Sequence, residues 1–375
     1  MKKINQLDLF SGIGGFHLGF EKAGYKVKSY FSEVDKHAIA VYKHKFKDSE
    51  YVGSVEHITG NELPRIDLIT FGSPCQDFSL AGKRKGMGGE RSSLVLEAIR
   101  LIGECRPRVF IWENVKGTFS SNSGEDFAAI LQAFADIGGY RLEWQLLNTS
   151  WFLPQNRERI YLVGYSTTTK RNWRGVFPIG EGGTTNTGSR VKAIGHRGTG
   201  GQQGIIYSDN GDSPTINASV YKDPTKVRIT DKRGNERNMD KASTLVAGYY
   251  KLPSDGDYIK VKSATKSGYE KAEEGDAINL TAINSKTRKG RVGKQKAQTL
   301  DTLCEQAAIQ DYHIRRLTPI ECERLQGFPD NHTEYGNYNG EVKKMSNTQR
   351  YKQCGNAVTT DVAQAIAEKI KPLFK

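Results

Sequence analysis

Apolar runs of strand length alternate with helical patterns through the first part of the chain. The runs predict strands at residues 7–10, 26–32, 66–71, 109–112, 141–147 and 160–163. The helical spacing predicts helices at residues 15–23, 35–45, 92–104 and 125–137. Strands that alternate with helices form a mostly parallel sheet with helices on its faces. We therefore expect an α/β fold with a doubly wound sheet.

This alternation stops at about residue 167 and returns after about residue 313. The segment between them is rich in Gly, Thr, Ser, Asn and basic residues, and it has short β-like patches without a long amphipathic helix. Helical patterns reappear at residues 318–326 and 358–370. We expect a first domain at 1–166, a smaller loop- and β-rich inserted domain at 167–313, and a C-terminal part at 314–375 that packs back on the first domain.

The insert places a threonine before an apolar residue three times, at Thr215, Thr244 and Thr299. These positions fit either related β-units or ordinary strand composition.

Composition narrows the class of partner. The chain of 375 residues has a formal charge of +13, which favours a polyanionic partner, although a basic surface can also serve solubility alone. No apolar stretch approaches the roughly 18 residues of a membrane span, and the N-terminus lacks the apolar region of a signal peptide. The five cysteines have no metal-ligand spacing, so we expect reduced thiols, no metal site, no membrane contact and a cytoplasmic protein.

One of these thiols has a distinctive setting. Cys75 lies in the loop Ser73-Pro74-Cys75-Gln76, which follows the apolar run 66–71. A cysteine there is either buried core or a nucleophile, because free cysteines are among the most buried residues. The polar, basic and glycine-rich stretch that follows favours the nucleophile.

The first chemical motif is DLFSGIGGFHLGFEKAG, from Asp8 to Gly24, and it has the pattern of strand, glycine turn and helix. Gly12 and Gly14 permit a tight turn and close approach of a ligand to the backbone. Glu33 follows about 20 residues later, where a carboxylate can bind two ribose hydroxyls. The full phosphate-binding pattern is missing, so S-adenosylmethionine fits better than a dinucleotide; the alternative is a turn that only packs helix on strand.

Two more sites follow predicted strands or precede them. Glu113 comes directly after the apolar strand 109–112, at the edge where open α/β sheets bind ligands. Apolar surroundings would let it donate a hydrogen bond near neutral pH, but a helix-capping or salt-bridging role is the alternative. Arg157 and Arg159 occupy alternate positions before an apolar strand, so both could reach one anionic or carbonyl group, unless they pair with Glu158 or line an edge strand.

Together these residues carry a family resemblance. The segments DLFSGIGGF, the acidic strand end Glu33-Val34-Asp35, GSPCQDFS, ENV, QNRERIYLVG, RLTPIECERLQGFPD and QCGNAV resemble, in order, the motifs of bacterial or phage DNA (cytosine-5) methyltransferases. The resemblance covers residues 6–165 and 314–370. It implies a Rossmann-like methyltransferase sheet completed by an antiparallel strand, with the insert as the target recognition domain.

The resemblance also implies residue roles. Cys75 would attack carbon 6 of cytosine, Glu113 would bind ring nitrogen 3 and the exocyclic amine, and Arg159 would assist the thiolate alongside Arg157. S-adenosyl-L-methionine would contact Phe10, Gly12, Gly14, Glu33, Ser54, Pro74 and Asn356. The chain departs from the family at Ser54, where members commonly carry an acid that meets the adenine amine, and this change bears on cofactor affinity.

The implied substrate is double-stranded DNA, from which the target cytosine must be flipped out. The expected DNA-binding residues are Gln76, Ser79, Thr215, Thr244, Thr299, Arg288, Lys289 and Arg291. Among the threonines, the stretch GIIYSDNGDSPTINAS favours Thr215. We expect a monomer in a bacterial cell or phage-infected host. A cognate restriction endonuclease is a possible partner that the sequence does not decide. Methylation of RNA and DNA binding without catalysis are the alternatives.

Overall fold

The computed structural model describes residues 2–73, 94–119, 124–168, 175–180, 228–230, 236–237, 259–281, 285, 287, 289–303, 305–310 and 313–374. Its largest unit is a seven-stranded sheet of order β3-β2-β1-β4-β5-β7-β6. The strands are β1 (Lys2–Leu9), β2 (Tyr25–Ser32), β3 (Glu50–Tyr51), β4 (Leu68–Gly72), β5 (Val109–Val115), β6 (Tyr140–Asn148) and β7 (Glu158–Ser166). Strands β1 to β5 pair in parallel, whereas β7 runs antiparallel to both β5 and β6. This confirms the expected doubly wound sheet with an antiparallel strand.

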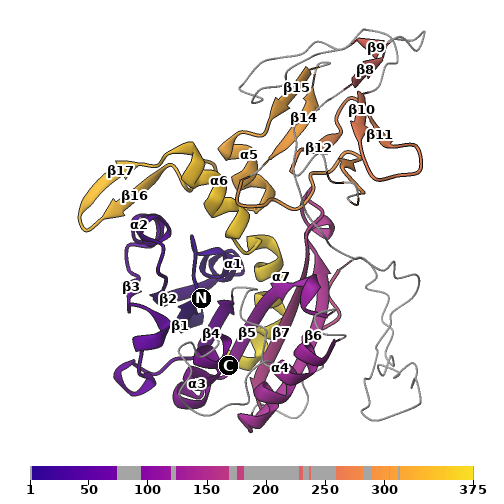
Figure 1. The fold of residues 1–375 in the computed structure, drawn as a ribbon. Coiled ribbons are helices and arrows are strands. Elements are labelled where there is room, and N and C mark those ends of the chain that lie inside the picture. The colour runs from indigo at the N-terminus through magenta and orange to yellow at the C-terminus, as the bar shows by residue number, and fades with distance from the viewer. Residues whose placement is uncertain are drawn as a thin grey trace, which may run out of the picture.

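Helices cover both faces of this sheet (Figure 1). On one face α1 (Gly15–Lys22) and α7 (Thr360–Ile370) share a core with side chains such as Ile4 and Ile111. On the other face α3 (Leu94–Cys105) and α4 (Glu125–Asp136) pack on Leu7 and Phe110. Successive strand residues point to opposite faces, so the continuous apolar runs predicted from the sequence supply both cores at once.

The described residues of the insert form two small antiparallel sheets above the large one (Figure 1). One sheet contains β8 (Arg228–Thr230), β9 (Glu236–Arg237), β10 (Ile259–Lys262) and β11 (Tyr269–Ala272). The other contains β12 (Ala277–Asn279), β13 (Val292–Gly293), β14 (Gln306–Gln310) and β15 (His313–Arg316). Two contacts cross the expected domain boundaries at residues 166 and 313. Val176 and Ile179 pack in the core of the large sheet, and β15 pairs with β14.

The C-terminal part adds elements that the apolar pattern did not predict. Helix α5 (Pro319–Leu325) was expected, but the hairpin of β16 (Tyr335–Tyr338) and β17 (Glu341–Lys344) and helix α6 (Asn347–Asn356) were not. The buried positions of α6 include Arg350 and Gln353, so the helix has no apolar stripe to reveal it. Arg350 instead lies 3.0 Å from the fully buried carboxylate of Glu323.

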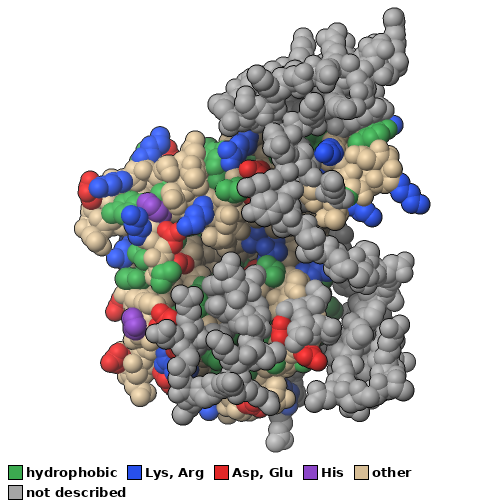
Figure 2. Space-filling model, in the orientation of Figure 1, with side chains coloured by type: hydrophobic (Ala, Val, Ile, Leu, Met, Phe, Trp, Pro, Cys, Tyr) green, Lys and Arg blue, Asp and Glu red, His purple; other side chains and the backbone are tan. Residues whose placement is uncertain are grey.

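The remaining helices and the surface complete the picture. Helix α2 (Lys36–Lys45) begins at the N-cap Asp35, and short 3-10 helices lie at Val55–His57, Gly60–Glu62, Lys116–Phe119, Thr149–Trp151 and Lys371–Phe374. Figure 2 shows Lys and Arg side chains over the β16–β17 hairpin with its neighbouring helices, and again over the small sheets. None of the helices in the described part of the chain is long and apolar enough to cross a membrane.

Candidate active site

The glycine turn after β1 has an unusual backbone. Phe10 adopts a φ of 50°, which is uncommon and costly for a residue with a side chain, and such strain concentrates at functional sites. Gly12 also has a positive φ, and a Cβ added there would meet no atom within 4 Å. At Gly14 an added Cβ would lie 2.3 Å from the ring of Phe46. Helix packing therefore explains Gly14, whereas Gly12 borders open space.

Glu33 lies beside this turn, as predicted. Its carboxylate accepts hydrogen bonds from the backbone amides of Gly12 at 2.9 Å, Val34 at 2.8 Å and Asp35 at 3.0 Å. A carboxylate has about four acceptor positions, so one remains for a ligand hydroxyl while these three bonds persist. The hydroxyl of Ser11 is buried and has no hydrogen-bond partner among the described residues. This donor and acceptor set fits a nucleoside with free hydroxyls.

The sequence interpretation missed one residue here. Val34 follows Glu33 directly, and its side chain is 78% exposed. An exposed apolar side chain next to this carboxylate can pack against the face of a planar ring. The signal in the sequence was an apolar residue placed immediately after the strand-end acid.

Three further cofactor candidates occupy different settings. Ser54 follows Gly53, whose φ is 89°, and is the N-cap of the 3-10 helix Val55–His57. Asn356 is exposed at the end of α6. Pro74 lies outside the described residues, as do Cys75, Gln76 and Ser79.

Glu113 and Arg159 form an ion pair at the end of the sheet. Glu113 Oε1 lies 3.1 Å from Arg159 Nε, and their side chains are only 11% and 15% exposed. The antiparallel register explains the encounter, because Arg159 on β7 pairs with Val115, two residues along β5 from Glu113. Diagonal neighbours on one face of a sheet lie within reach of long side chains. The structure thus brings together two residues that the sequence singled out separately.

The chain leaves β4 beside this pair. Gly72 pairs with Glu113 in the parallel register, and a Cβ added at Gly72 would lie 3.0 Å from Glu113 Oε2. Ser73 is then held by Trp112, whose Nε1 donates to its hydroxyl at 3.0 Å, and by Asn114, whose Nδ2 donates to its carbonyl at 3.1 Å. These side chains anchor the segment that leads to Pro74 and Cys75. Sequence reasoning did not single out Asn114.

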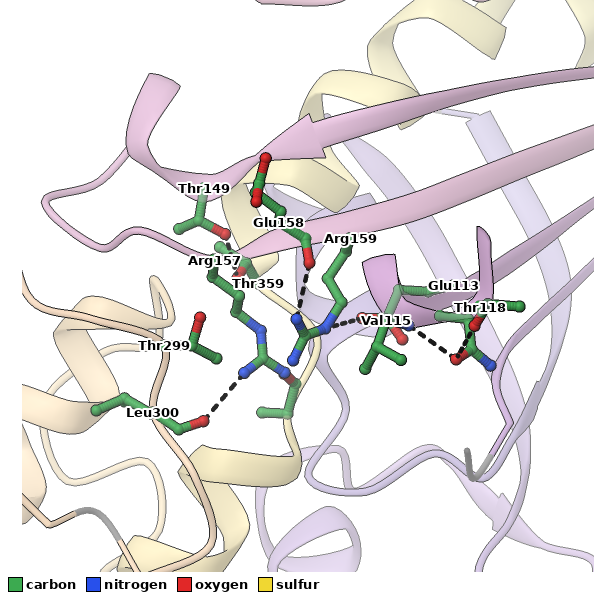
Figure 3. A network of polar contacts seen from close by, with 12 residues as sticks. Glu113, Val115, Thr118, Thr149, Arg157, Glu158, Arg159, Thr299, Leu300 and Thr359 are labelled. Atoms are coloured by element: carbon green, nitrogen blue, oxygen red, sulfur yellow. Dashed lines mark hydrogen bonds and ion pairs between the residues drawn. The ribbon is translucent and has the colours of Figure 1, made fainter. Parts of the chain in front are cut away.

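Arg157 differs from its prediction. Figure 3 shows its guanidinium bonded to the carbonyl of Leu300, whereas that of Arg159 is bonded to Glu113. Arg157 is 4% exposed and donates to the carbonyls of Leu300 at 3.2 Å, Gly355 at 3.3 Å and Ala357 at 2.9 Å. The two arginines therefore do not reach one shared group, as the sequence had suggested they could. Residues 300 and 355–357 fold against Arg157 and supply its acceptors, whereas Arg159 pairs with Glu113.

The basic residues expected to bind DNA are only partly placed as predicted. Arg291 is completely buried and donates to the carbonyls of Asn279 and Thr281, so its side chain is not presented to a phosphate. Lys289 is exposed. The Thr299 hydroxyl donates to the carbonyl of Asn156 at 2.7 Å. Arg288, Thr215 and Thr244 lie outside the described residues.

A buried acid lies next to the glycine turn. Asp8, at the end of β1, accepts hydrogen bonds from Thr70 Oγ1 at 2.6 Å and Tyr42 at 3.2 Å. Burial raises its pKa to about 7. Nearby, His332 reaches from the C-terminal part to the carbonyl of Ile13 in the turn at 2.9 Å, and burial lowers the pKa of His332 to about 4.

The sheet, the glycine turn with its carboxylate, and the acid–arginine pair at the strand ends form the arrangement of an α/β enzyme with a nucleoside site at the carboxyl ends of its strands. The model of the C-5 cytosine-specific DNA methylase family matches residues 4–372, and the chain belongs to that family. It is an S-adenosyl-L-methionine-dependent DNA (cytosine-5) methyltransferase.

Curated relatives agree with this assignment, and a solved structure shares the fold. The chain is 32% identical to the type II methyltransferase M1.ScrFI of Lactococcus lactis subsp. cremoris, over 98% of this chain and 78% of the relative. It is 30% identical to M.HpaII of Haemophilus parainfluenzae, over 98% and 89%. A structure of a DNA modification methyltransferase described as putative, encoded within an Escherichia coli prophage, shares the fold with a TM-score of 0.55 at 20% identity, over 99% of both chains.

Proposed function

We propose that this enzyme methylates carbon 5 of a cytosine flipped out of a specific double-stranded DNA sequence, through a covalent adduct with Cys75. The observation that carries the proposal is the Glu113–Arg159 pair. It lies at the strand end from which the anchored Ser73 leads the chain toward Cys75. Two residues span at most about 7 Å along the chain, so Cys75 can lie no farther than that from Ser73.

The nucleophile needs activation. A free thiol with a pKa of about 8.5 is only a few per cent ionised at neutral pH. Arg159 carries a positive charge in a water-poor setting, and this charge stabilises a nearby thiolate. Addition of the thiolate to carbon 6 opens the double bond between carbons 5 and 6 and moves electrons toward nitrogen 3.

Glu113 handles the charge that develops on the ring. Its Oε1 pairs with Arg159, which leaves Oε2, on the side of Gly72, to face the base. With Oε1 still accepting from Arg159, a proton on Oε2 would pass to nitrogen 3 as the thiolate adds. Carbon 5 then gains the methyl group. Loss of the carbon 5 proton to a base would restore the double bond between carbons 5 and 6 and expel the Cys75 thiolate. The nitrogen 3 proton would return to Glu113 in the same step.

The residues around the glycine turn would hold the cofactor. When bound, S-adenosyl-L-methionine supplies the methyl group as an electrophile. Glu33 would accept a ribose hydroxyl at its remaining acceptor position, and Val34 with Phe10 would offer apolar contact to the adenine. Pro74, Ser54 and Asn356 are further proposed contacts, with Ser54 the weaker substitute for the family's acid.

The insert would read the DNA sequence. Thr215 remains the favoured recognition residue, and Lys289, which is exposed, suits a phosphate contact. Relatives such as M1.ScrFI and M.HpaII are named type II methyltransferases. On that basis we propose a role in DNA modification, in which a cognate restriction endonuclease could cut the same sequence. We also propose that the enzyme acts as a monomer.

Covalent trapping tests the proposal. DNA that contains 5-fluorocytosine cannot lose a proton from carbon 5, so the wild-type enzyme should remain attached to it when the cofactor is present. The site is first mapped by bisulfite sequencing of DNA from cells that express the enzyme, and a duplex carrying that site is then synthesised with the fluorinated base.

Two variants make the test specific. Cys75→Ser should form no adduct and should lose methyl transfer by at least about 10⁴-fold, while it still binds cofactor and DNA. Glu113→Gln should trap at least about 100-fold more slowly. Full turnover by Cys75→Ser, or transfer of tritiated methyl groups to tRNA in preference to DNA, would contradict the proposal.

A further inference from the structure

One buried guanidinium joins three segments that are far apart in the sequence. Arg157 lies before β7, Leu300 belongs to the last part of the insert, and Gly355 and Ala357 lie at the end of α6. All three acceptors are backbone carbonyls, and Arg157 is 4% exposed. Figure 3 shows the bond to Leu300. A planar guanidinium presents its donors in a fixed fork, so these bonds fix the relative positions of the segments.

On the DNA side, the end of the insert is tied to the loop that carries Arg157. The amide of Asn156 donates to the carbonyl of Ala297 at 2.7 Å, and the amide of Ala297 donates to Pro154 at 2.9 Å. The Thr299 hydroxyl donates to the carbonyl of Asn156. This end of the insert therefore cannot move without displacing the loop of Arg157.

On the cofactor side, the two α6 carbonyls flank Asn356. The backbones also touch directly, since a Cβ added at Gly355 would lie 2.2 Å from the carbonyl oxygen of Asp301. Any shift of residues 300–301 is thus transmitted to the loop that presents Asn356. Arg159, two residues beyond Arg157, carries the same connection to Glu113.

We propose that Arg157 is a positioning residue that couples DNA binding by the insert to cofactor binding at Asn356, so that each ligand strengthens the binding of the other. The inference rests on the proposed function, in which the insert reads DNA and Asn356 faces the cofactor. It replaces the catalytic role expected for Arg157. Coupling of this kind is reciprocal: cofactor must tighten DNA binding by the same factor as DNA tightens cofactor binding.

Binding measurements test the proposal without turnover. The dissociation constant of a duplex carrying the mapped site is measured with and without saturating S-adenosyl-L-homocysteine, for the wild type, Arg157→Lys and Arg157→Gln. We expect a tightening of at least about fivefold in the wild type, the lower end of typical coupling factors. In both variants the factor should fall to within about twofold of one.

Arg291 provides the matched control. It is also a buried arginine that donates to two backbone carbonyls, but both partners, Asn279 and Thr281, lie within the insert. Arg291→Lys should keep the wild-type coupling factor even if its melting temperature falls as far as that of Arg157→Lys. An equal loss of coupling in the Arg291 variant would show that Arg157 has only a structural role and would overturn the proposal.

A measurement on the wild type covers the case in which the Arg157 variants do not fold. S-adenosyl-L-homocysteine alone should slow hydrogen exchange of backbone amides in residues 297–303, which lie on the insert side of Arg157. Unchanged exchange there, a wild-type coupling factor of one, or folded Arg157 variants with the wild-type factor would each refute the inference. Failure of covalent trapping, by contrast, would refute the proposed function.

Discussion

Replacing Gly72 by alanine should slow methyl transfer without unfolding the protein. The added Cβ would lie 3.0 Å from Glu113 Oε2, closer than the ordinary contact distance of 3.4–4 Å. Glu113 must then move by a few tenths of an ångström, and its ion pair with Arg159, now at 3.1 Å, must adjust. The methyl group thus displaces the acid without changing its chemistry.

The size of the effect follows from this displacement. A misplacement of 1 Å in an active site can cost about 100-fold in rate, so a few tenths of an ångström should lower kcat about five- to tenfold. That loss corresponds to about 1 kcal/mol in the barrier. The stability of the fold should fall by about 1–3 kcal/mol, the usual cost of inserting a methyl group into a well-packed site.

The assay is the incorporation of tritiated methyl groups at saturating cofactor and DNA, with thermal unfolding measured in parallel. Gly103→Ala is the control, because a Cβ added at Gly103, inside α3, meets no atom within 4 Å. This control should keep the wild-type kcat and gain about 0.5–1 kcal/mol of stability. A wild-type kcat in Gly72→Ala would show that the position of the Glu113 carboxylate does not limit the reaction, and would refute the reasoning.

Three other predictions concern stability and positioning. Because the pKa of Asp8 is raised to about 7, the folded state binds the extra proton between pH 3.8 and 7 and loses stability as the pH rises through that window. Asp8→Asn should remove this dependence, so its stability relative to the wild type should increase by a few kcal/mol from pH 4 to pH 8 in denaturant titrations. His332 acts in the opposite sense, because its pKa of about 4 means that stability falls as the pH drops from 6.5 to 4. His332→Gln should remove that fall in the same titrations. If the stability of the variant still fell with pH as in the wild type, the burial argument would be contradicted. Asn114→Ala removes the hydrogen bond to the Ser73 carbonyl and should lower kcat about 10- to 100-fold, with little change in the KM for the cofactor. Steady-state assays measure both constants. A larger change in KM than in kcat would count against a role of Asn114 in positioning the loop of Cys75.

Much of the fold was predictable because burial leaves a periodic record in the chain. The helices and all strands of the large sheet except β3 were found within five residues of their observed limits, since each buries apolar side chains at regular spacing. Strand β3 was missed because its two residues are exposed. Helix α6 was missed because it lacks such an apolar period. Its buried positions include Arg350 and Gln353, which pair with groups from other segments. A polar side chain gives no sign in the sequence that a distant partner will cover it.

The candidate site divides in the same way. The sequence by itself determined the residue types and their order: the glycine turn, the strand-end acid Glu33, the loop of Cys75, and the acid Glu113. Only the tertiary structure decided that Arg159 meets Glu113 while Arg157 turns to three backbone carbonyls, and that Arg291 is buried. The physical reason is that local spacing sets the direction of a side chain only within regular secondary structure. The partner of a charged group depends on which distant segments fold against it.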